Sequence, residues 1–253
     1  MARLVRATSV IDRTARLFDR ARSRLVLRLG SDAFFDVFND AAYADENSYR
    51  TADLDARHGL FDWEQRLVRD FLPPPPATIL VGAAGGGRES LALAQRGYSV
   101  VAFEPVARLA SSLAQVAAAE SRIEPLVGRY QDLPLMRRLG QSGLVNLAER
   151  PPFDAALFGW ISFSHGADAT RIDALCRVAS LTRGPIVVSY FPASARAPRA
   201  HQATFSVWIG YCREISPEEL RGFARAAGLA VTHIDETGSF AALERLDRTA
   251  TAQ

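Results

Sequence analysis

Two features of the sequence combine residue types and spacing that could bind a ligand. The first is a glycine-rich stretch, Gly82-Ala-Ala-Gly-Gly-Gly87, which lies between a short apolar run and a helical pattern. Glycines at such a turn let ligand atoms approach the backbone, where side chains would otherwise collide. The second is Glu104, which lies 17 residues after Gly87 at the end of the next apolar run. A carboxylate there can accept hydrogen bonds from both ribose hydroxyls of an adenosine-containing ligand.

His165 is the candidate catalytic residue. It lies in a loop after the apolar run 154–158, at the carboxyl edge of a predicted parallel sheet, which is where ligands bind in such sheets. There it could act as a general base, contact a substrate or cofactor, or lie on the surface. His201 and His58 are weaker candidates, and His233 fits an edge strand.

An α/β sheet is needed to bring these groups together. We expect strands at 78–81, 98–103, 124–127, 154–158, 186–190, 230–234 and 240–246. Helices are expected at 89–96, 106–120, 168–181 and 216–228, the last with Ser216 as its N-cap and a glutamate three residues later. The alternation predicts a doubly wound, mostly parallel sheet of seven strands.

The chain before the first predicted strand differs from the rest. Residues 1–30 are rich in arginine and have apolar residues at helical spacing, so they predict an amphipathic helix. That helix could lie on the body of the protein, act as a lid or dimer arm, or bind an anionic membrane surface. The aromatic residues of 31–63 and of an irregular insertion at 193–211 could together roof a pocket. A run of four prolines, 73–76, separates the helical part from the sheet.

The composition is that of an ordinary globular protein. Of the 253 residues 48% are hydrophobic and 23% charged, which excludes a disordered chain. No apolar stretch reaches the ~18–20 residues of a membrane span, and the N-terminal arginines interrupt any signal-peptide core. Two isolated cysteines, Cys176 and Cys212, form neither a disulfide framework nor a zinc motif. We therefore expect a cytoplasmic protein that uses no metal.

The charge distribution argues against a nucleic-acid partner. All 30 basic residues are arginine, but 28 acidic residues nearly balance them. The expected partner is a small molecule, without nucleic acid and without an integral membrane segment. A homodimer remains open.

Two cofactors fit the glycine cluster and Glu104. Gly85-Gly-Gly87-Arg-Glu-Ser90 nearly matches the dinucleotide fingerprint of nicotinamide-dependent oxidoreductases, with serine in the last place. Such enzymes usually need a separate substrate domain, whereas the residues after Glu104 are used up in completing the sheet. S-adenosylmethionine is the alternative, and methyl transfer from it depends mainly on positioning and needs no metal.

The sequence resembles the class I S-adenosylmethionine-dependent methyltransferases from about Tyr43 to Leu246. The family's glycine motif matches Ala83-Ala-Gly-Gly-Gly87, and the acidic residue that ends its second strand matches Glu104. The later motifs match, in order, Gly128-Arg-Tyr-Gln-Asp-Leu-Pro134, Phe153-Asp-Ala-Ala-Leu-Phe-Gly159 and the segment from Tyr211 through the last helix and strand. Together, five matches in the family's order and spacing are a specific signal.

The resemblance implies a Rossmann-like methyltransferase domain at 73–253, with a helical extension or lid at 1–72. It implies metal-independent, in-line methyl transfer from S-adenosylmethionine to a small molecule, with His165 as the candidate base. The implied cofactor contacts are Ala83, Gly85, Gly87, Glu104, Tyr130, Gln131 and Gly159, together with Tyr43 and Arg50 over the methionine end. Arg50 could pair with the carboxylate of the cofactor. A non-catalytic, cofactor-binding member of the same fold is the other interpretation that the residues leave open.

The chain departs from the family pattern at three places. Ala83 stands at the first glycine of the motif, no acidic residue ends the first strand, and Arg129 stands where an aspartate often contacts the adenine amino group. These departures concern the adenine and methionine ends of the cofactor, while the ribose contact through Glu104 is intact.

Overall fold

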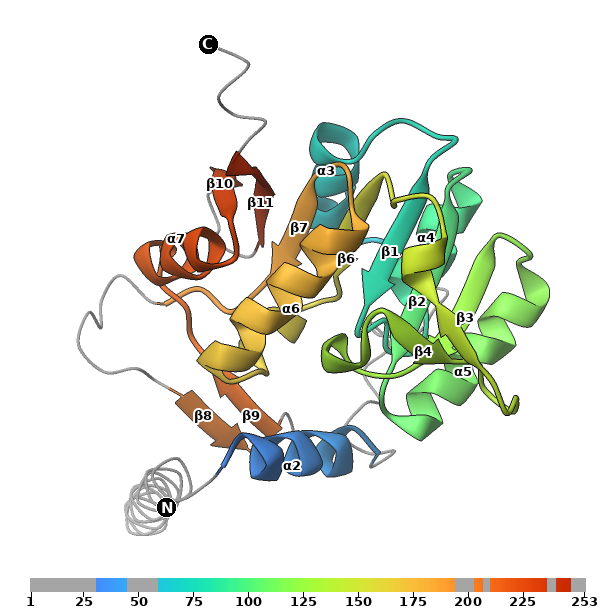
Figure 1. Ribbon diagram of the computed structural model, residues 1–253, viewed down its shortest axis with the longest axis horizontal. Coiled ribbons are helices and arrows are strands. Elements are labelled where there is room, and N and C mark those ends of the chain that lie inside the picture. The colour runs from blue at the N-terminus through green and yellow to red at the C-terminus, as the bar shows by residue number, and fades with distance from the viewer. Residues whose placement is uncertain (1–30, 45–58, 194–202, 207–209, 236–239, 247–253) are drawn as a thin grey trace, which may run out of the picture.

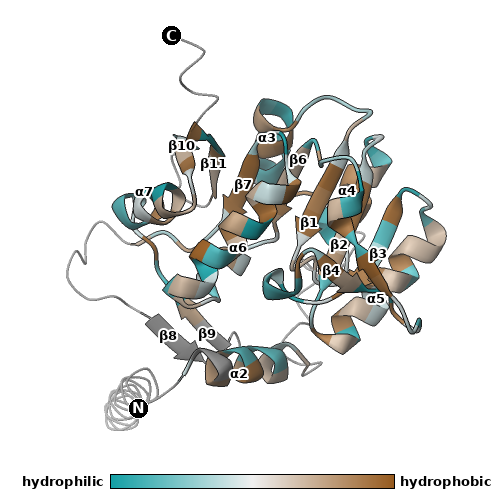
Figure 2. Ribbon diagram, viewed as in Figure 1, coloured by the Kyte–Doolittle hydropathy of each residue, from teal (hydrophilic) through white to brown (hydrophobic). Residues whose placement is uncertain are grey.

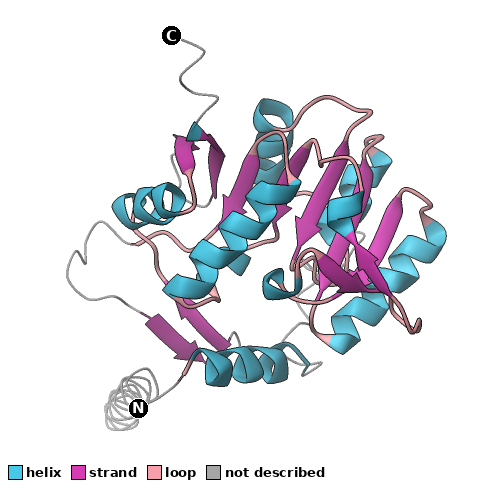
Figure 3. Cartoon of the chain, viewed as in Figure 1, coloured by secondary structure: helices cyan, strands magenta, loops and turns pink. Residues whose placement is uncertain are grey.

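The computed structural model describes residues 31–44, 59–193, 203–206, 210–235 and 240–246. Within these residues a nine-stranded sheet runs through the molecule, with helices on both faces (Figures 1 and 3). None of the described helices is long and apolar enough to span a bilayer. The predicted N-terminal amphipathic helix and Arg50 lie outside the described residues.

The main sheet combines a parallel centre with antiparallel edges. Its strands are β1 (Thr78–Gly82), β2 (Ser99–Glu104), β3 (Ile123–Val127), β4 (Leu135–Arg137), β5 (Leu144–Asn146), β6 (Ala155–Phe158), β7 (Ile186–Ser189), β10 (Leu229–Ile234) and β11 (Phe240–Arg245). Their spatial order is β10-β11-β7-β6-β1-β2-β3-β4-β5. The five strands from β7 to β3 in that order pair in parallel, and the outer ones pair antiparallel.

The helices of the described residues cover the two faces and one edge of this sheet. They are α2 (Asp32–Ala44), α3 (Asp62–Phe71), α4 (Arg88–Gln95), α5 (Ala107–Ala119), α6 (Asp168–Leu181) and α7 (Pro217–Ala226). Three short 3₁₀ helices, η3 (Tyr130–Asp132), η4 (Leu147–Glu149) and η5 (Ser162–Ser164), lie in the loops. Figure 1 shows α2 across the carboxyl ends of the central strands.

Alternation along the buried strands builds two hydrophobic cores. Ile79 and Val81 of β1 belong to the core that includes side chains of α3, α4 and α5, whereas Leu80 belongs to the core with α6 and α7. A strand buried on both faces reads as a continuous apolar run, as Thr78–Gly82 does. Figure 2 shows hydrophobic residues concentrated along the central strands.

Local signals in the sequence predicted several elements correctly. The helix expected at 168–181 is α6, with the same bounds. Helix α7 begins with the expected capping box: Ser216 Oγ accepts from the Glu219 N–H at 3.2 Å, and a Glu219 carboxylate oxygen accepts from the Ser216 N–H at 2.9 Å. The reciprocal bonds satisfy two backbone donors that a helix start leaves unpaired.

Two regions differ from the expectation. The predicted seven strands are present, but β4 and β5 extend the sheet to nine within the described residues. These are strands of three residues each, too short to show an alternating pattern. The insertion expected to be irregular forms, where it is described, a two-stranded antiparallel sheet of β8 (Ala203–Ser206) and β9 (Gly210–Arg213). This small sheet lies beside α2 (Figure 1).

Candidate functional site

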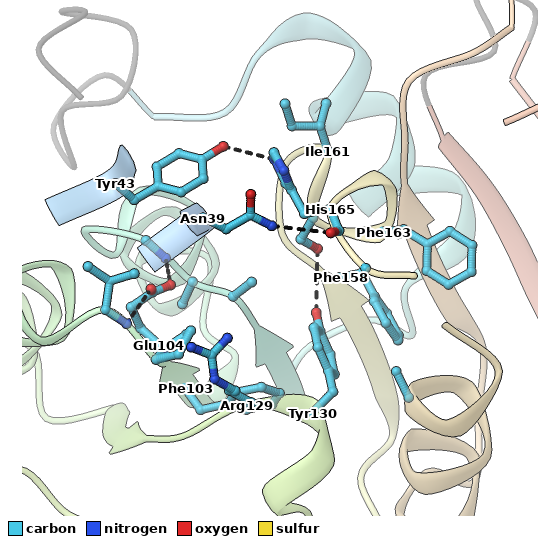
Figure 4. A pocket seen from close by; sticks show the side chains of 18 of the residues that line it. Asn39, Tyr43, Phe103, Glu104, Arg129, Tyr130, Phe158, Ile161, Phe163 and His165 are labelled. Atoms are coloured by element: carbon cyan, nitrogen blue, oxygen red, sulfur yellow. Dashed lines mark hydrogen bonds between the residues drawn. The ribbon is translucent and has the colours of Figure 1, made fainter. Parts of the chain in front are cut away.

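A cavity of about 330 Å³ opens at the carboxyl ends of β1, β2 and β6, between the sheet and α2. Its walls come from the inner face of α2, the glycine turn after β1, the loops after β2, β3 and β6, and the start of α6. Figure 4 shows the side chains that point into it. Both its position at this sheet edge and its volume are typical of small-molecule sites.

Glu104, the last residue of β2, is a buried carboxylate in the cavity wall. The residue is 4% exposed, and its two carboxylate oxygens accept hydrogen bonds from the backbone N–H groups of Gly85 and Val106, each at 2.9 Å (Figure 4). Burial raises the pKa of Glu104 to about 7, although the two N–H donors act in the opposite direction. The structure thus brings Glu104 and the glycine turn together at the cavity.

The turn after β1 is held in an uncommon backbone conformation. Ala83 and Gly85 both have positive φ, 51° and 55°. A non-glycine residue rarely adopts this region because its Cβ crowds the backbone, so Ala83 takes a conformation that usually selects glycine. Behind the turn, the Gly159 N–H donates to the Gly82 carbonyl at 2.8 Å, and a Cβ at Gly159 would overlap the Ala83 carbonyl oxygen. Gly159 therefore shapes the turn and is not itself a lining residue.

Gly87 is also outside the cavity lining. It precedes α4 with φ of 96°, and a Cβ built there would lie 3.1 Å from Leu113 Cδ1 on α5. The absence of a side chain at Gly87 lets α4 pack closely against α5, and its contact with the cofactor stays a prediction.

We expect Gly87→Ala to lower the free energy of unfolding by about 1–2 kcal/mol, because alanine is strained in the left-handed region. Gly86→Ala is the matched control, since φ at Gly86 is outside that region and the nearest atom to a built Cβ, Ser112 Cβ, is 3.9 Å away. Urea denaturation of both variants measures the difference. Equal stability of the two variants would contradict this account of the turn.

Tyr130 forms an aromatic floor under the cavity. Its ring stacks on Phe158 with centroids 4.4 Å apart and meets Phe103 edge-on at 5.0 Å. A Cβ at Gly82 would lie 2.5 Å from the Tyr130 hydroxyl oxygen, so this glycine makes room for the ring. Burial raises the pKa of Tyr130, which keeps its hydroxyl protonated. Tyr130 is therefore a neutral, fixed wall of the site.

Helix α2 is tied to both sides of the cavity. On one side the Tyr43 hydroxyl lies 2.8 Å from His165 Nε2, and Asn39 Nδ2 donates to the His165 carbonyl oxygen at 3.2 Å (Figure 4). On the other side Asp40 pairs with Arg129, which follows β3. Burial raises the pKa of Asp40, while the neighbouring Arg129 opposes that shift. Hydrogen bonds at both walls hold α2 across the cavity.

The last turn of α2 has a cation at its end. Arg108 of α5 donates to the Tyr43 and Ala44 carbonyl oxygens at 2.9 and 3.2 Å. A guanidinium at a helix C-terminus satisfies carbonyls that have no intrahelical partner and interacts favourably with the helix dipole. This contact fixes the end of α2 above the loop after β2.

The loop after β6 carries a second strained residue. Ile161 has φ of 50°, a conformation that is a genuine outlier for a β-branched side chain. Its N–H donates to Ser189 Oγ at 3.0 Å, which anchors the loop to β7. Such strain persists where the surroundings fix it, and it is concentrated at ligand sites. Ile161 lines the cavity next to the loop that carries His165.

Three charged side chains are buried behind the glycine turn. Arg88 forms a two-point ion pair with Glu64, with N–O distances of 2.5 and 2.6 Å. Arg88 Nη2 also donates to Glu89 Oε1 at 2.9 Å. Of these three, Arg88 and Glu89 line the cavity. We call Glu64, Arg88 and Glu89 the buried charge cluster.

The structure therefore brings together most, but not all, of the residues selected from the sequence. The lining includes Tyr43, Ala83, Gly85, Glu104, Tyr130, Gln131 and His165. Sequence reasoning selected Tyr43 on the inner face of α2 but missed Asn39 and Asp40 beside it, and it missed Glu89. The adjacency of Arg88-Glu89 to the glycines was visible, but their ion pair with Glu64 depends on how α3 packs.

Comparison with known proteins identifies the fold. No protein-family model and no curated protein sequence matches the chain. Among solved structures, the mitomycin 7-O-methyltransferase MmcR superposes with a TM-score of 0.59 at 15% identity, over 90% of this chain and 67% of that one. The CcbJ methyltransferase from Streptomyces caelestis gives 0.58 at 17% identity, over 81% of this chain and 98% of the other.

A third similar structure was solved with ligands. It is the Burkholderia thailandensis 1,6-didemethyltoxoflavin-N1-methyltransferase, with bound 1,6-didemethyltoxoflavin and S-adenosylhomocysteine. Its TM-score is 0.57 at 18% identity, over 85% of this chain and 88% of that one. The chain therefore has the Rossmann-like fold of the class I S-adenosylmethionine-dependent methyltransferases, as its sequence motifs predicted.

Proposed function

We propose that this protein is an S-adenosylmethionine-dependent methyltransferase that acts on a small-molecule acceptor. The observation that carries the proposal is the cavity in which the Glu104 carboxylate and the Gly85 backbone meet under α2. The similar structures include methyltransferases that are named after small molecules, mitomycin and 1,6-didemethyltoxoflavin. Their names support the reaction class and leave the acceptor of this chain to experiment.

The residues present fit the adenosine part of the cofactor. Each Glu104 oxygen accepts one backbone hydrogen bond, and a carboxylate has about four acceptor positions, which leaves capacity for two ribose hydroxyls. Val106 and Leu109 add apolar wall on the α5 side, suited to a flat base. Burying an ionised carboxylate costs free energy unless the carboxylate is hydrogen-bonded. Hydroxyl donors from a ligand would therefore stabilise the ionised form of Glu104.

The protein's own contribution to the reaction is positioning. The cofactor, when bound, supplies a methyl group that is already activated for transfer. The chain binds the cofactor at the turn after β1 and holds the acceptor between α2 and the loop after β6. The same elements keep water out of the cavity. Holding two reactants in line is the largest part of catalysis for such a displacement.

His165 is the residue that we propose as general base. His165 lines the cavity, its Nε2 is hydrogen-bonded to the Tyr43 hydroxyl, and its backbone carbonyl accepts from Asn39. If the acceptor group must lose a proton, the imidazole can accept it at neutral pH. Tyr43 then keeps the ring oriented while α2 covers the site.

Tyr43→Ala is expected to lower turnover about 10-fold or more without unfolding the protein, because misplacing a reactant is costly. The variant removes a cavity wall and the hydrogen bond to His165, while Arg108 and Arg129 still hold α2. Val37→Ala is the control, because Val37 is 69% exposed on the same helix. Methyl-transfer rates of the two variants against wild type provide the test. Full activity in Tyr43→Ala would remove α2 from the account of the acceptor site.

The activity itself is tested by incubating the protein with methyl-labelled S-adenosylmethionine and fractions of a small-molecule extract. We expect label in at least one acceptor fraction, and less of it with the Glu104→Ala variant when the cofactor is limiting. Binding of the cofactor without transfer to any fraction would favour a non-catalytic member of the fold. Reduction of a nicotinamide cofactor, followed by absorbance, would favour the oxidoreductase alternative.

A further inference from the structure

Arg171 of α6 carries a guanidinium that is buried in the wall of the cavity. The residue is 2% exposed and is among the largest side chains that the described part of the chain buries. It lines the cavity together with Thr170 and Ala174 of the same helix. Burying a guanidinium costs free energy unless its charge is paired and its N–H groups are hydrogen-bonded. The groups that satisfy Arg171 therefore show what this residue holds in place.

The partners of Arg171 include two consecutive backbone carbonyls of η5. Its Nε donates to the Phe163 oxygen at 2.7 Å, and its Nη2 donates to the Ser164 oxygen at 3.0 Å. Its Nη1 pairs with Asp168, and the guanidinium carbon lies 5.7 Å from the ring centroid of Phe223 on α7. A helix of three residues leaves its last carbonyls without intrahelical partners. The planar fork of arginine can reach two such oxygens and a carboxylate at once.

The loop that Arg171 holds is the one that carries His165. The carbonyl of Ser164 directly precedes His165, and Ser164 Oγ accepts from the Phe191 N–H at 2.8 Å. The end of η5 is therefore held by the chain after β7 as well as by α6. At its start η5 follows the strained Ile161, and such strain persists only where the surroundings fix the backbone. Arg171 thus fixes the end of the loop from which the His165 side chain reaches the cavity wall.

A second arginine connects this site to the insertion between β7 and α7. Arg213 of β9, which is 8% exposed, pairs with Asp168 and with Glu219 of α7. Asp168 thus lies between the guanidiniums of Arg171 and Arg213, and its own side chain is 55% exposed. A change at Asp168 therefore perturbs the hold on Arg171 without opening the core.

We propose that Arg171 is a positioning residue that sets the place of His165 in the cavity by holding the two carbonyls before it. The inference rests on the proposed function, because it takes His165 to face the acceptor. Arg171 acts on the backbone of the loop and leaves the cofactor end of the cavity unchanged. A lysine would keep the charge, but it lacks the planar fork that reaches both carbonyls and Asp168.

The first test is a double-mutant cycle on turnover with an acceptor found by the labelling assay. Arg171→Lys should lower turnover about 10-fold or more, because a misplaced reacting group is costly, and should leave the affinity for S-adenosylhomocysteine unchanged. In the His165→Gln background the same change should cost little more, because the imidazole that Arg171 places is then absent. Losses that multiply in the double variant would overturn the proposal. Arg177→Lys is the matched control, since Arg177 of the same helix donates to a carbonyl outside η5, that of Leu133, at 2.6 Å.

The second test needs no acceptor. Nuclear magnetic resonance of protein with isotope-labelled histidine records the imidazole signals, and His165→Gln identifies the signal of His165 by its loss. Arg171→Lys should move this signal and leave that of His233 on β10 in place, whereas Arg177→Lys should move neither. If Arg171→Lys does not fold, Asp168→Asn replaces it in the same measurement and should move the same signal.

An unmoved His165 signal in a folded variant would overturn the proposal, because the ring would then keep its place without the hold on η5. Movement of the His165 and His233 signals together would also overturn it, since the substitution would then act on the whole fold. If wild type does not bind S-adenosylhomocysteine, the proposed function fails. The His165 signal then still decides whether Arg171 places the ring.

Discussion

Replacing Glu104 by alanine is expected to weaken binding of S-adenosylhomocysteine by about 10- to 100-fold, since hydrogen bonds to a charged group contribute about 1.5–3 kcal/mol. The buried carboxylate is the group in the cavity wall that we assign to the ribose hydroxyls, and alanine also leaves the Gly85 and Val106 N–H groups without their acceptor. Glu218→Ala is the control, because Glu218 is exposed on α7. Unchanged affinity in the Glu104 variant would remove the ribose assignment.

The same carboxylate predicts the pH dependence of binding. The pKa of Glu104 is raised to about 7 by burial, so below pH 7 the group is protonated in the free protein. Hydroxyl donors prefer the ionised form, and binding then has to release a proton. Affinity should therefore fall as pH drops through 7, by at most about 10-fold per pH unit. Calorimetry between about pH 5.5 and 8 measures this slope, and Glu104→Gln should flatten it. A slope that persists in the Gln variant would assign the titration to another group.

The sign of the stability effect follows from the same shift. A carboxyl whose pKa is raised by folding binds protons more readily in the folded protein than in the unfolded chain. The free protein should therefore become less stable, through this group, as pH rises from about 4.5 to 7. A ligand that donates hydrogen bonds to the ionised carboxylate offsets this loss of stability.

Replacing His165 by glutamine should lower turnover by about 10²-fold or more at pH 7 when the acceptor must lose a proton, which is the range of general-base catalysis. Glutamine can keep a hydrogen bond to Tyr43 but cannot accept the proton, so the variant separates base catalysis from positioning. His233→Ala is the control, because His233 is exposed on β10, with its ring 4.7 Å from that of Phe71.

The defect at His165 should shrink as pH rises, because the acceptor then ionises without help. Turnover of wild type and variant is measured from about pH 6 to 9, above and below the ordinary histidine pKa. A defect of constant size would demote His165 from base to packing or binding residue. A variant with full activity throughout would show that the acceptor needs no base.

Local patterns predicted the central sheet well, for physical reasons. Strands buried on both faces must be continuously apolar, and the start of α7 carries the capping residues Ser216 and Glu219. The short edge strands β4 and β5 were missed because three residues carry no periodicity. The pairing of β8 with β9 was also missed, because the sequence of the insertion at 193–211 looks irregular.

The site was predictable where it depends on one turn, and unpredictable where it depends on packing. The glycine spacing and Glu104 belong to one strand–helix–strand unit, from β1 through α4 to β2, and the structure places Gly85 and Glu104 in contact. The family resemblance assigned Gly87 and Gly159 to the cofactor, and this stays a prediction; the structure shows that their missing Cβ atoms make room for α5 and for the Ala83 carbonyl. The Tyr43–His165 and Glu64–Arg88 pairs join residues 122 and 24 positions apart, and neither spacing follows from a local pattern.

The most direct test of the account is a calorimetric titration of the wild-type protein with S-adenosylhomocysteine at pH 8, without added metal. We predict saturable binding of one ligand per chain, which weakens in the Glu104→Ala variant and persists in Glu218→Ala. At this pH Glu104 is ionised and able to accept the ribose hydroxyls. Absence of binding by the folded wild-type protein, or identical binding by the Glu104 variant, would contradict the assignment of this cavity to the methyl donor.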